Sequence, residues 1–236
     1  MTPPIGLAMA IYLVFQAQSG TGPAEHTWRV DGGAAGNDTG PGTYDQPFKT
    51  IEKTLSVAEP GDTVRIASGV YPGPVTISRS GMNGKAITLE AAECHGTIMD
   101  AGWKAAFCLT CPPEVSYITL RALVLRGAKS HGVRVRTGWR VEDGVIEECG
   151  EADRGSALDV RLDDEGRKRA EGVTFLRTIV QDCDSNGITN KEALSTMPRP
   201  PAAGCREDRP PFSRPASPST RALSFSLTLG MPYPPP

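Results

Sequence analysis

Three short segments of the sequence carry charged or polar side chains at matching positions. In each segment apolar and polar residues alternate, which is typical of a strand buried on one side. If the strands pair in register, one outward column contains Arg134, Asp159 and Thr189, and the next contains Arg136, Arg161 and Lys191. Paired strands lie ~4.8 Å apart, so the second column would be a line of three cations. Such a line suits an extended polymer whose carboxylates also repeat.

Other strand-like runs precede each segment, and together they form an internal repeat. The runs are Ile118–Leu120 with Leu123 and Leu125, then Val141 with Val145 and Ile146, and then Val173–Phe175 with Ile179. A repeat of about 22 to 32 residues is typical of a solenoid. The charged insertion at residues 163–169 is expected to project as a loop, and Cys149 and Cys183 occupy equivalent positions. Extending the first column towards the N-terminus would add Arg65 and Cys108.

The stack is expected to begin at Gly61–Tyr71, where Val64 and Ile66 alternate with polar residues between two glycines. Just upstream, Phe48, Ile51, Leu55 and Ala58 are three or four residues apart, which predicts a short helix with one apolar face over residues 47–60. The first coil of a solenoid exposes strand edges and apolar side chains. We therefore expect this helix to cover that end of the stack.

These stretches carry a family resemblance. Gly36–Thr39, Gln46–Ile51, Gly61–Val64 and Gly69–Tyr71 resemble the N-terminal signature of the pectate-lyase-like superfamily. The resemblance spans roughly residues 30–190 and implies an all-β fold: a right-handed parallel β-helix with three strands per coil. The superfamily contains lyases, hydrolases, epimerases and proteins without known chemistry, so fold and function are separate questions.

The resemblance also implies a chemistry. A lyase that cleaves uronates by β-elimination needs a base, commonly Lys or Arg, and often Ca²⁺ to neutralise the substrate carboxylate. Lys191 and Arg161 are the candidate bases, and Arg134, Arg136, Asp159, Arg161 and Lys191 are the candidate substrate-binding residues. Asp159, Asp182 and Asp184 are the candidate calcium ligands. Calcium-dependent relatives have acidic residues where this chain has Ser185–Thr189, which argues against that calcium site.

The flanks of the repeat differ from it. The apolar run Ile5–Phe15 is short for a membrane span and suits an export signal over residues 1–19, although residues 1–4 carry no Lys or Arg; the alternative is a buried or disordered leader. Residues 20–46 are expected to form a linker and loop, and residues 61–193 the β-helix.

The stretch 194–236 is rich in proline and is expected to be disordered, apart from Leu223–Leu229, whose alternation predicts an added strand. Because the repeats stop without a recognisable cap, a truncated or frame-shifted gene is an alternative origin of the tail.

Several single residues leave alternatives open. Asn37–Thr39 matches a glycosylation sequon, but it also suits a tight turn. A local disulfide between Cys108 and Cys111, or one from Cys94 to either, is expected in an exported chain. Cys149 and Cys183 are expected to stack inside the coils, with a disulfide as the alternative. His131 is expected to be a turn residue.

Composition narrows the function without naming it. A formal net charge of −2 gives no overall field for nucleic acid. The resemblance implies polysaccharide as the partner, and we expect no nucleic acid, no membrane and a monomer. The first hypothesis is a secreted protein that binds acidic polysaccharide and, if active, cleaves it by β-elimination. The alternatives are a non-catalytic glycan-binding or surface scaffold protein, and a truncated inactive fragment.

Overall fold

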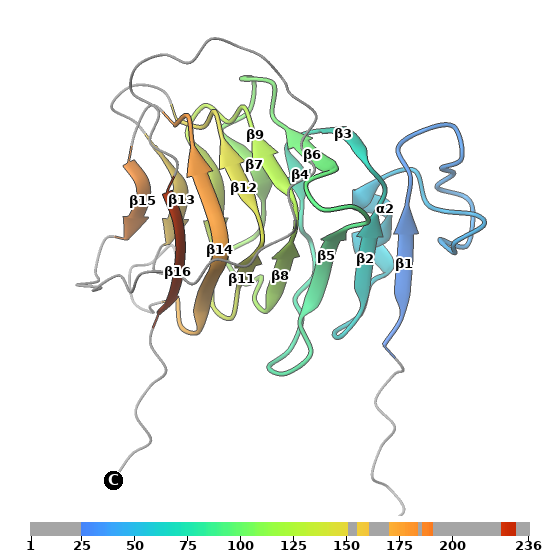
Figure 1. Ribbon diagram of the computed structural model, residues 1–236. Coiled ribbons are helices and arrows are strands. Elements are labelled where there is room, and N and C mark those ends of the chain that lie inside the picture. Colours follow the sequence, from blue (N-terminus) through green and yellow to red (C-terminus); the bar gives the residue numbers. More distant parts are fainter. Residues whose placement is uncertain (1–24, 151–154, 161–169, 184–185, 191–222, 230–236) are drawn as a thin grey trace, which may run out of the picture.

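The computed structural model describes residues 25–150, 155–160, 170–183, 186–190 and 223–229. Its strands form two hydrogen-bonded sheets, and the larger one continues through β14 (Val173–Gln181) from one layer to a second, so that three layers of parallel strands, called sheets 1, 2 and 3, wrap around one axis (Figure 1). Sheet 1 contains β1 (Thr27–Val30), β2 (Thr63–Ile66), β5 (Ile87–Ala91), β8 (Ile118–Arg121), β11 (Arg140–Glu142) and the first part of β14. Sheet 2 contains β3 (Gly69–Pro72), β6 (Thr97–Asp100), β9 (Val124–Arg126), β12 (Val145–Glu147) and the second part of β14. Sheet 3 contains β4 (Val75–Thr76), β7 (Phe107–Thr110), β10 (His131–Val135), β13 (Ser156–Val160) and β15 (Asn186–Asn190).

Each coil contributes one strand to each sheet, as the repeat predicted. The coil that begins with β8 continues through β9 to β10, and the next runs from β11 through β12 to β13. The coils follow one another along the axis, from the blue N-terminal strands to the orange β14 in Figure 1. The chain therefore has the right-handed parallel β-helix fold that the sequence predicted.

The core consists of columns of apolar side chains inside the coils. One column contains Val64, Leu89, Leu120, Val141 and Phe175, which pair in register across sheet 1 and are almost completely buried. Burying one such side chain contributes about 1.5–3 kcal/mol. A single coil cannot hide these groups, so the apolar contacts between coils hold the stack together.

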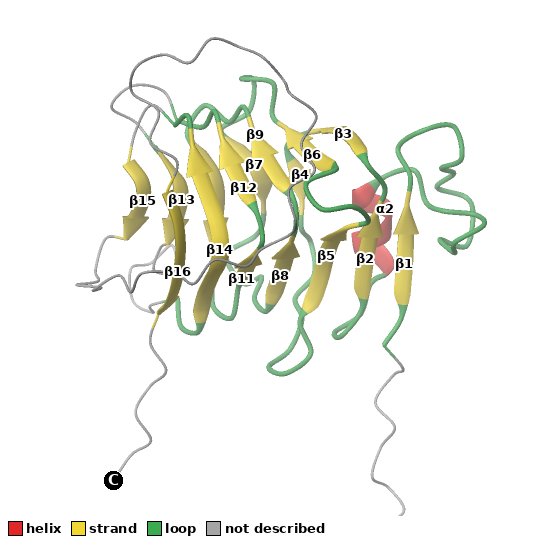
Figure 2. Ribbon diagram, viewed as in Figure 1, coloured by secondary structure: helices red, strands yellow, loops and turns green. Residues whose placement is uncertain are grey.

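The predicted helix is present as α2 (Ile51–Val57), which packs against β1, β2 and β4 at the N-terminal end of the stack (Figure 2). It is shorter than the predicted residues 47–60. The helix begins only after Thr50, the N-cap, whose hydroxyl accepts a hydrogen bond from the Lys53 amide, and Ala58 is its C-cap. Phe48 lies before the helix, in a bridge with Val30. Phe48, Ile51, Leu55 and Ala58 are all buried, as the spacing predicted.

At the other end of the stack, β16 (Leu223–Leu229) pairs antiparallel with β14. The alternation in this tail segment predicted an added strand, and the structure confirms it. β14 runs continuously through sheets 1 and 2, where the sequence suggested two separate strands. The export signal, the insertion at 163–169 and the rest of the tail lie outside the described residues. Within the described residues, none of the helices has the length and apolar character needed to span a membrane.

Candidate polysaccharide-binding site

Sheet 3 brings together the residues that the sequence singled out for chemistry. Val133 pairs with Leu158, and Leu158 with Ile188, so the three aligned segments stack in the predicted register. Arg134 lies beside Asp159, and Asp159 beside Thr189, as the first column required. Val133, Val135, Leu158 and Val160 are buried, so the alternation within these segments is also correct.

The centre of this site is an ion pair between neighbouring coils. Arg134 Nε donates to Asp159 Oδ2 at 2.9 Å. The Asp159 side chain is fully buried, whereas a quarter of the Arg134 side chain is exposed. A hydrogen bond between charged groups is shorter and stronger than a neutral one. Asp159 thus fixes the guanidinium through Nε, and within the described residues no acceptor bonds the terminal nitrogens of Arg134.

Two aromatic rings complete the cluster. The guanidinium of Arg134 lies over the ring of Phe107, 4.8 Å from its centroid. His131 stacks on the same ring with the centroids 5.5 Å apart, and its Nε2 is 3.6 Å from Asp159 Oδ2. Phe107 is partly exposed. A cation held over a partly exposed ring offers charge and an apolar face at one place, which suits a sugar acid.

His131 contacts both Ser156 and Asp159, but the three residues do not form a nucleophilic triad. His131 Nδ1 lies 3.0 Å from Ser156 Oγ, and that hydroxyl donates to Leu158 O at 2.9 Å. Ser156 is fully buried, and its proton points to a carbonyl rather than to a base. A nucleophile must be both accessible and hydrogen-bonded to its base. Ser156 therefore holds His131, and His131 helps to position Asp159 and, through it, Arg134.

Of the expected line of cations, Arg136, Arg161 and Lys191, only Arg136 lies among the described residues, and its burial makes the expected open position wrong there. Asp159 neutralises Arg134, and Arg136 is buried next to the thiol of Cys111. The alternation of a strand says which side of the sheet a residue faces, but not what covers that side. Arg161, Lys191 and Asp184 lie outside the described residues, and Thr189 is described by its backbone alone.

The continuation of the column towards the N-terminus was also wrong. Arg65 belongs to β2 in sheet 1, and the position next to Arg134 is taken by Thr110, because Val133 pairs with Leu109. Thr110 Oγ1 is 3.2 Å from Thr76 Oγ1 of the preceding coil. The first two coils thus place hydroxyl groups where the third places a guanidinium.

The described donors do not fit a calcium ion at Asp159. Its carboxylate is bound to Arg134 and faces His131, two groups that carry or accept positive charge. Asp182 is exposed at the turn after β14, in the left-handed conformation with φ of +51°. Among the described residues no three His, Cys, Asp or Glu side chains form a group suited to a metal. Calcium needs six to eight oxygen ligands, so we derive no step through it.

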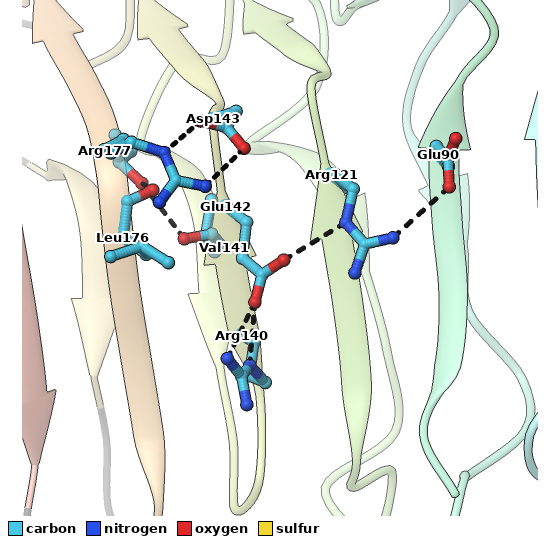
Figure 3. A network of polar contacts seen from close by, with 9 residues as sticks. Glu90, Arg121, Arg140, Val141, Glu142, Asp143, Leu176 and Arg177 are labelled. Atoms are coloured by element: carbon cyan, nitrogen blue, oxygen red, sulfur yellow. Dashed lines mark hydrogen bonds and ion pairs between the residues drawn. The ribbon is translucent and has the colours of Figure 1, made fainter. Parts of the chain in front are cut away.

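Sheet 1 carries a second polar network on its outer face, shown in Figure 3. Arg121 reaches Glu90 at 3.4 Å on one side and Glu142 at 3.1 Å on the other, and Arg140 binds Glu142 at 2.8 Å. Arg65 adds a longer contact to Glu90, at 3.8 Å. These side chains come from consecutive coils, so the charges alternate along the stack axis.

The cysteines differ from expectation in one respect. Cys108 and Cys111 are free, so the predicted disulfide between them is wrong; Cys94 is disulfide-bonded, but with neither of them. Cys149 and Cys183 are free thiols, which confirms interior stacking. Contact with the Cys108 thiol, together with burial, raises the pKa of Cys149, and contact with Cys149 raises that of Cys183. These thiols are therefore poor nucleophiles.

Asn37 lies in the exposed loop before α2. Its Oδ1 accepts both the amide and the hydroxyl of Thr39, at 3.0 and 2.8 Å. This is the tight turn that the sequence offered as the alternative to glycosylation. The glycosylation itself stays a prediction.

Sequence reasoning missed Phe107, His131 and Ser156. His131 was expected in a turn, but it lies in β10 and pairs with Phe107 and Ser156. The register of Val133 with Leu158 already implies that residues 131 and 156 are neighbours, so the signal was present. What the alignment could not show is that the His131 side chain contacts Phe107, Ser156 and the Asp159 carboxylate.

Comparisons with known proteins agree with this architecture. Residues 34–75 match the model of a family described as a protein of unknown function, DUF1565. The sequence matches no curated protein. Among solved structures, pectate lyase Pel9A is similar at 16% identity with a TM-score of 0.50, over 65% of this chain and 38% of that one.

Two further solved structures are similar at lower TM-scores. A rhamnogalacturonan lyase shares 19% identity with a TM-score of 0.44, over 65% of this chain and 51% of that one. An alginate lyase from Paenibacillus sp. str. FPU-7 shares 16% identity with a TM-score of 0.42, over 65% of this chain and 57% of that one. The chain thus spans less than two thirds of each of these proteins. At such identities the likeness to Pel9A shows the fold alone.

Proposed function

Because the chain has the right-handed parallel β-helix fold of pectate lyase Pel9A, we propose that it binds an acidic, uronate-containing polysaccharide on the outer face of sheet 3. The observation that carries this proposal is Arg134, which is fixed through Nε by Asp159 and lies over Phe107. Its terminal nitrogens are the donors for a substrate carboxylate, and Phe107 offers an apolar surface to the sugar ring. A fixed guanidinium loses little entropy when it binds.

We also propose that any cleavage proceeds by β-elimination. The base would remove the proton α to the uronate carboxylate, and Arg134 would stabilise the charge that develops on that carboxylate. The glycosidic C–O bond on the β carbon would then break as the C=C bond forms, and the leaving oxygen would take a proton from water. Lys191 and Arg161 follow β15 and β13 in the sequence and are the candidate bases. We further propose that the chain is exported, which the apolar run at residues 5–15 supports. We also propose that it is a monomer.

The experiment is binding of oligogalacturonates together with absorbance of unsaturated uronate products. Arg134→Gln should weaken binding about tenfold or more, because a charge-assisted hydrogen bond is lost. Arg134→Lys keeps the charge beside Asp159 but loses the forked geometry, so it should fold normally and still bind more weakly. Lys49→Gln is the charge control, because Lys49 is exposed and lies just before α2, outside sheet 3. Unchanged binding by both Arg134 variants would contradict the proposal.

A second candidate function is a non-catalytic glycan-binding scaffold. The observation that favours it is the engagement of Asp159 by Arg134 and His131, which leaves this carboxylate unsuited to calcium. A flat absorbance trace with pectate, alginate and chondroitin, with and without calcium, alongside retention on a uronan gel, would select the scaffold. Product formation that is lost in Lys191→Ala or Arg161→Ala would select the lyase.

A further inference from the structure

The outer face of sheet 1 carries more positive than negative charge along one column. Arg29 pairs with Arg65, Arg65 with Glu90, Glu90 with Arg121 and Arg121 with Glu142, each on a successive coil. Arg140 joins the column through Glu142. Four arginines thus accompany two glutamates. We call this set, Arg29, Arg65, Glu90, Arg121, Arg140 and Glu142, the arginine column.

The two kinds of side chain in the arginine column differ in exposure. The side chains of Arg65, Arg121 and Arg140 are 39%, 43% and 49% exposed, whereas those of Glu90 and Glu142 are 22% and 10% exposed. The guanidinium groups are therefore more accessible than the carboxylates, and Figure 3 shows Arg121 between Glu90 and Glu142. A polymer approaching this face meets arginine first.

At the N-terminal end, the column contains a pair of like charges. Arg29 and Arg65 lie directly opposite each other on β1 and β2. Like charges at such positions destabilise a sheet. Within the described part of the chain Arg29 has no carboxylate partner, and Glu90 reaches Arg65 only at 3.8 Å. An anion bound between the two guanidinium groups would remove this repulsion.

Other polar groups beside the column suit a carbohydrate. The guanidinium of Arg29 lies 5.4 Å from the ring centroid of Tyr44, whose side chain is 79% exposed. A column of at least partly exposed threonines runs parallel to the arginines, through Thr27, Thr63 and Thr88, and ends at Thr119, which is buried. An exposed aromatic ring offers an apolar surface, and hydroxyl groups donate and accept hydrogen bonds.

We propose that the arginine column and Tyr44 form a second binding surface, for an extended anionic polysaccharide that runs along the stack axis. Arg65 and Arg121 lie two strand spacings apart, about 10 Å, so they can contact alternating acidic groups of one chain. Glu90 and Glu142 hold Arg121 and Arg140 in place, which limits the side-chain entropy lost on binding. The surface lies on a different sheet from Arg134, so the proposal does not depend on the sheet 3 site.

The sharpest test is Arg29→Gln. Because Arg29 has no carboxylate partner among the described residues and faces Arg65, its removal should leave the melting temperature unchanged or higher. The same change should weaken binding to polygalacturonate about fivefold, the effect of one exposed ionic contact. A residue with a purely structural role would not separate stability from binding in this direction.

The full set of variants is measured as the salt concentration that elutes the full chain from immobilised polygalacturonate. Arg65→Gln/Arg140→Gln and Tyr44→Ala should elute earlier than wild type, whereas the charge-matched Lys49→Gln/Lys104→Gln should elute close to wild type. Immobilised dextran sulfate separates sulfate from carboxylate recognition, and neutral dextran should not retain the protein.

The two surfaces are distinguishable by which variants lose binding. Loss in the Arg134 variants with wild-type elution of Arg29→Gln and the Arg65 double variant overturns the second surface and leaves the sheet 3 site standing. Loss in the sheet 1 variants alone supports the second surface and contradicts the sheet 3 site. Equal elution of the sheet 1 variants and the Lys49 control variant also overturns the second surface.

Discussion

The outer faces of sheets 1 and 3 are built from the same kind of strand but hold their charges differently. On sheet 1 arginine and glutamate alternate from coil to coil between Arg65 and Glu142, and the arginines are partly exposed. On sheet 3 one arginine meets one fully buried aspartate, beside a histidine and a phenylalanine. Among the described residues, the alternating face repeats along the stack, whereas the sheet 3 cluster occurs once.

The difference teaches what in-register stacking can and cannot do. Parallel pairing places the same strand position of each coil in one column, so opposite charges in neighbouring coils stabilise the register. Exposed pairs of this kind each contribute little free energy. A buried carboxylate is costly unless it is paired, so the sheet 3 cluster depends on each of its contacts. The first arrangement suits an extended partner, and the second suits a local binding site.

The largest expected effect is at Asp159. Asp159→Ala leaves Arg134 and His131 without the carboxylate between them, and we expect a loss of about 3 kcal/mol in the free energy of unfolding. Chemical denaturation measures this loss. Glu90→Ala, which removes a partly exposed carboxylate on sheet 1, is the matched comparison and should cost much less. Equal costs would show that the two faces do not differ in the way described.

A smaller effect is expected within sheet 1 itself. Glu142→Ala removes the acceptor of both Arg121 and Arg140, and we expect a loss of about 1 kcal/mol, because the arginines are partly solvated. Glu142→Gln keeps the shape and should lose less. If Glu142→Ala were as stable as wild type, the alternating charges would not contribute to register.

Salt should change the stability cost of a charge-removing variant on sheet 1 more than that of one on sheet 3. Between about 0.01 M and about 1 M salt, the screening length falls from ~30 Å to ~3 Å, which weakens exposed pairs more than buried ones. The cost of Glu90→Ala should therefore shrink towards zero at high salt, while that of Asp159→Ala should persist. Chemical denaturation of both variants at the two salt concentrations measures these costs. If the costs of Glu90→Ala and Asp159→Ala changed equally with salt, the two faces would not differ in exposure as described.

The smallest effect is a pH dependence at Asp100, on the outer face of sheet 2. Burial alone would raise the pKa of this carboxyl, but the hydrogen bonds from Arg126 and the Gly102 amide outweigh it and hold the pKa below the ordinary 3.8. A lowered pKa in the folded state contributes stability that is complete above the unfolded value and is lost as pH falls through the folded value. The stability difference between wild type and Asp100→Asn should therefore be constant above about pH 5 and disappear towards about pH 2. A difference that grows on acidification would contradict the assignment.

Much of the fold could be predicted because its signals are local. Alternation at Val64 and Ile66, and again at Val133 and Val135, depends only on the strand period of two. The spacing of Ile51 and Leu55 depends only on the helix period. The repeat then determined which residues lie side by side, since Leu158 can pair with Val133 and Ile188 only if the coils stack.

The sequence by itself determined the stack, the cap and the columns, because periodicity and repeat length are properties of neighbouring residues. The tertiary structure alone decided that Asp159 is buried, that Arg136 is covered, and that Arg65 lies on another sheet. These depend on which parts of the chain come to lie over a face and on where each coil turns. Electrostatic partners follow from those distances, so the charged face had to be located in space before it could be interpreted.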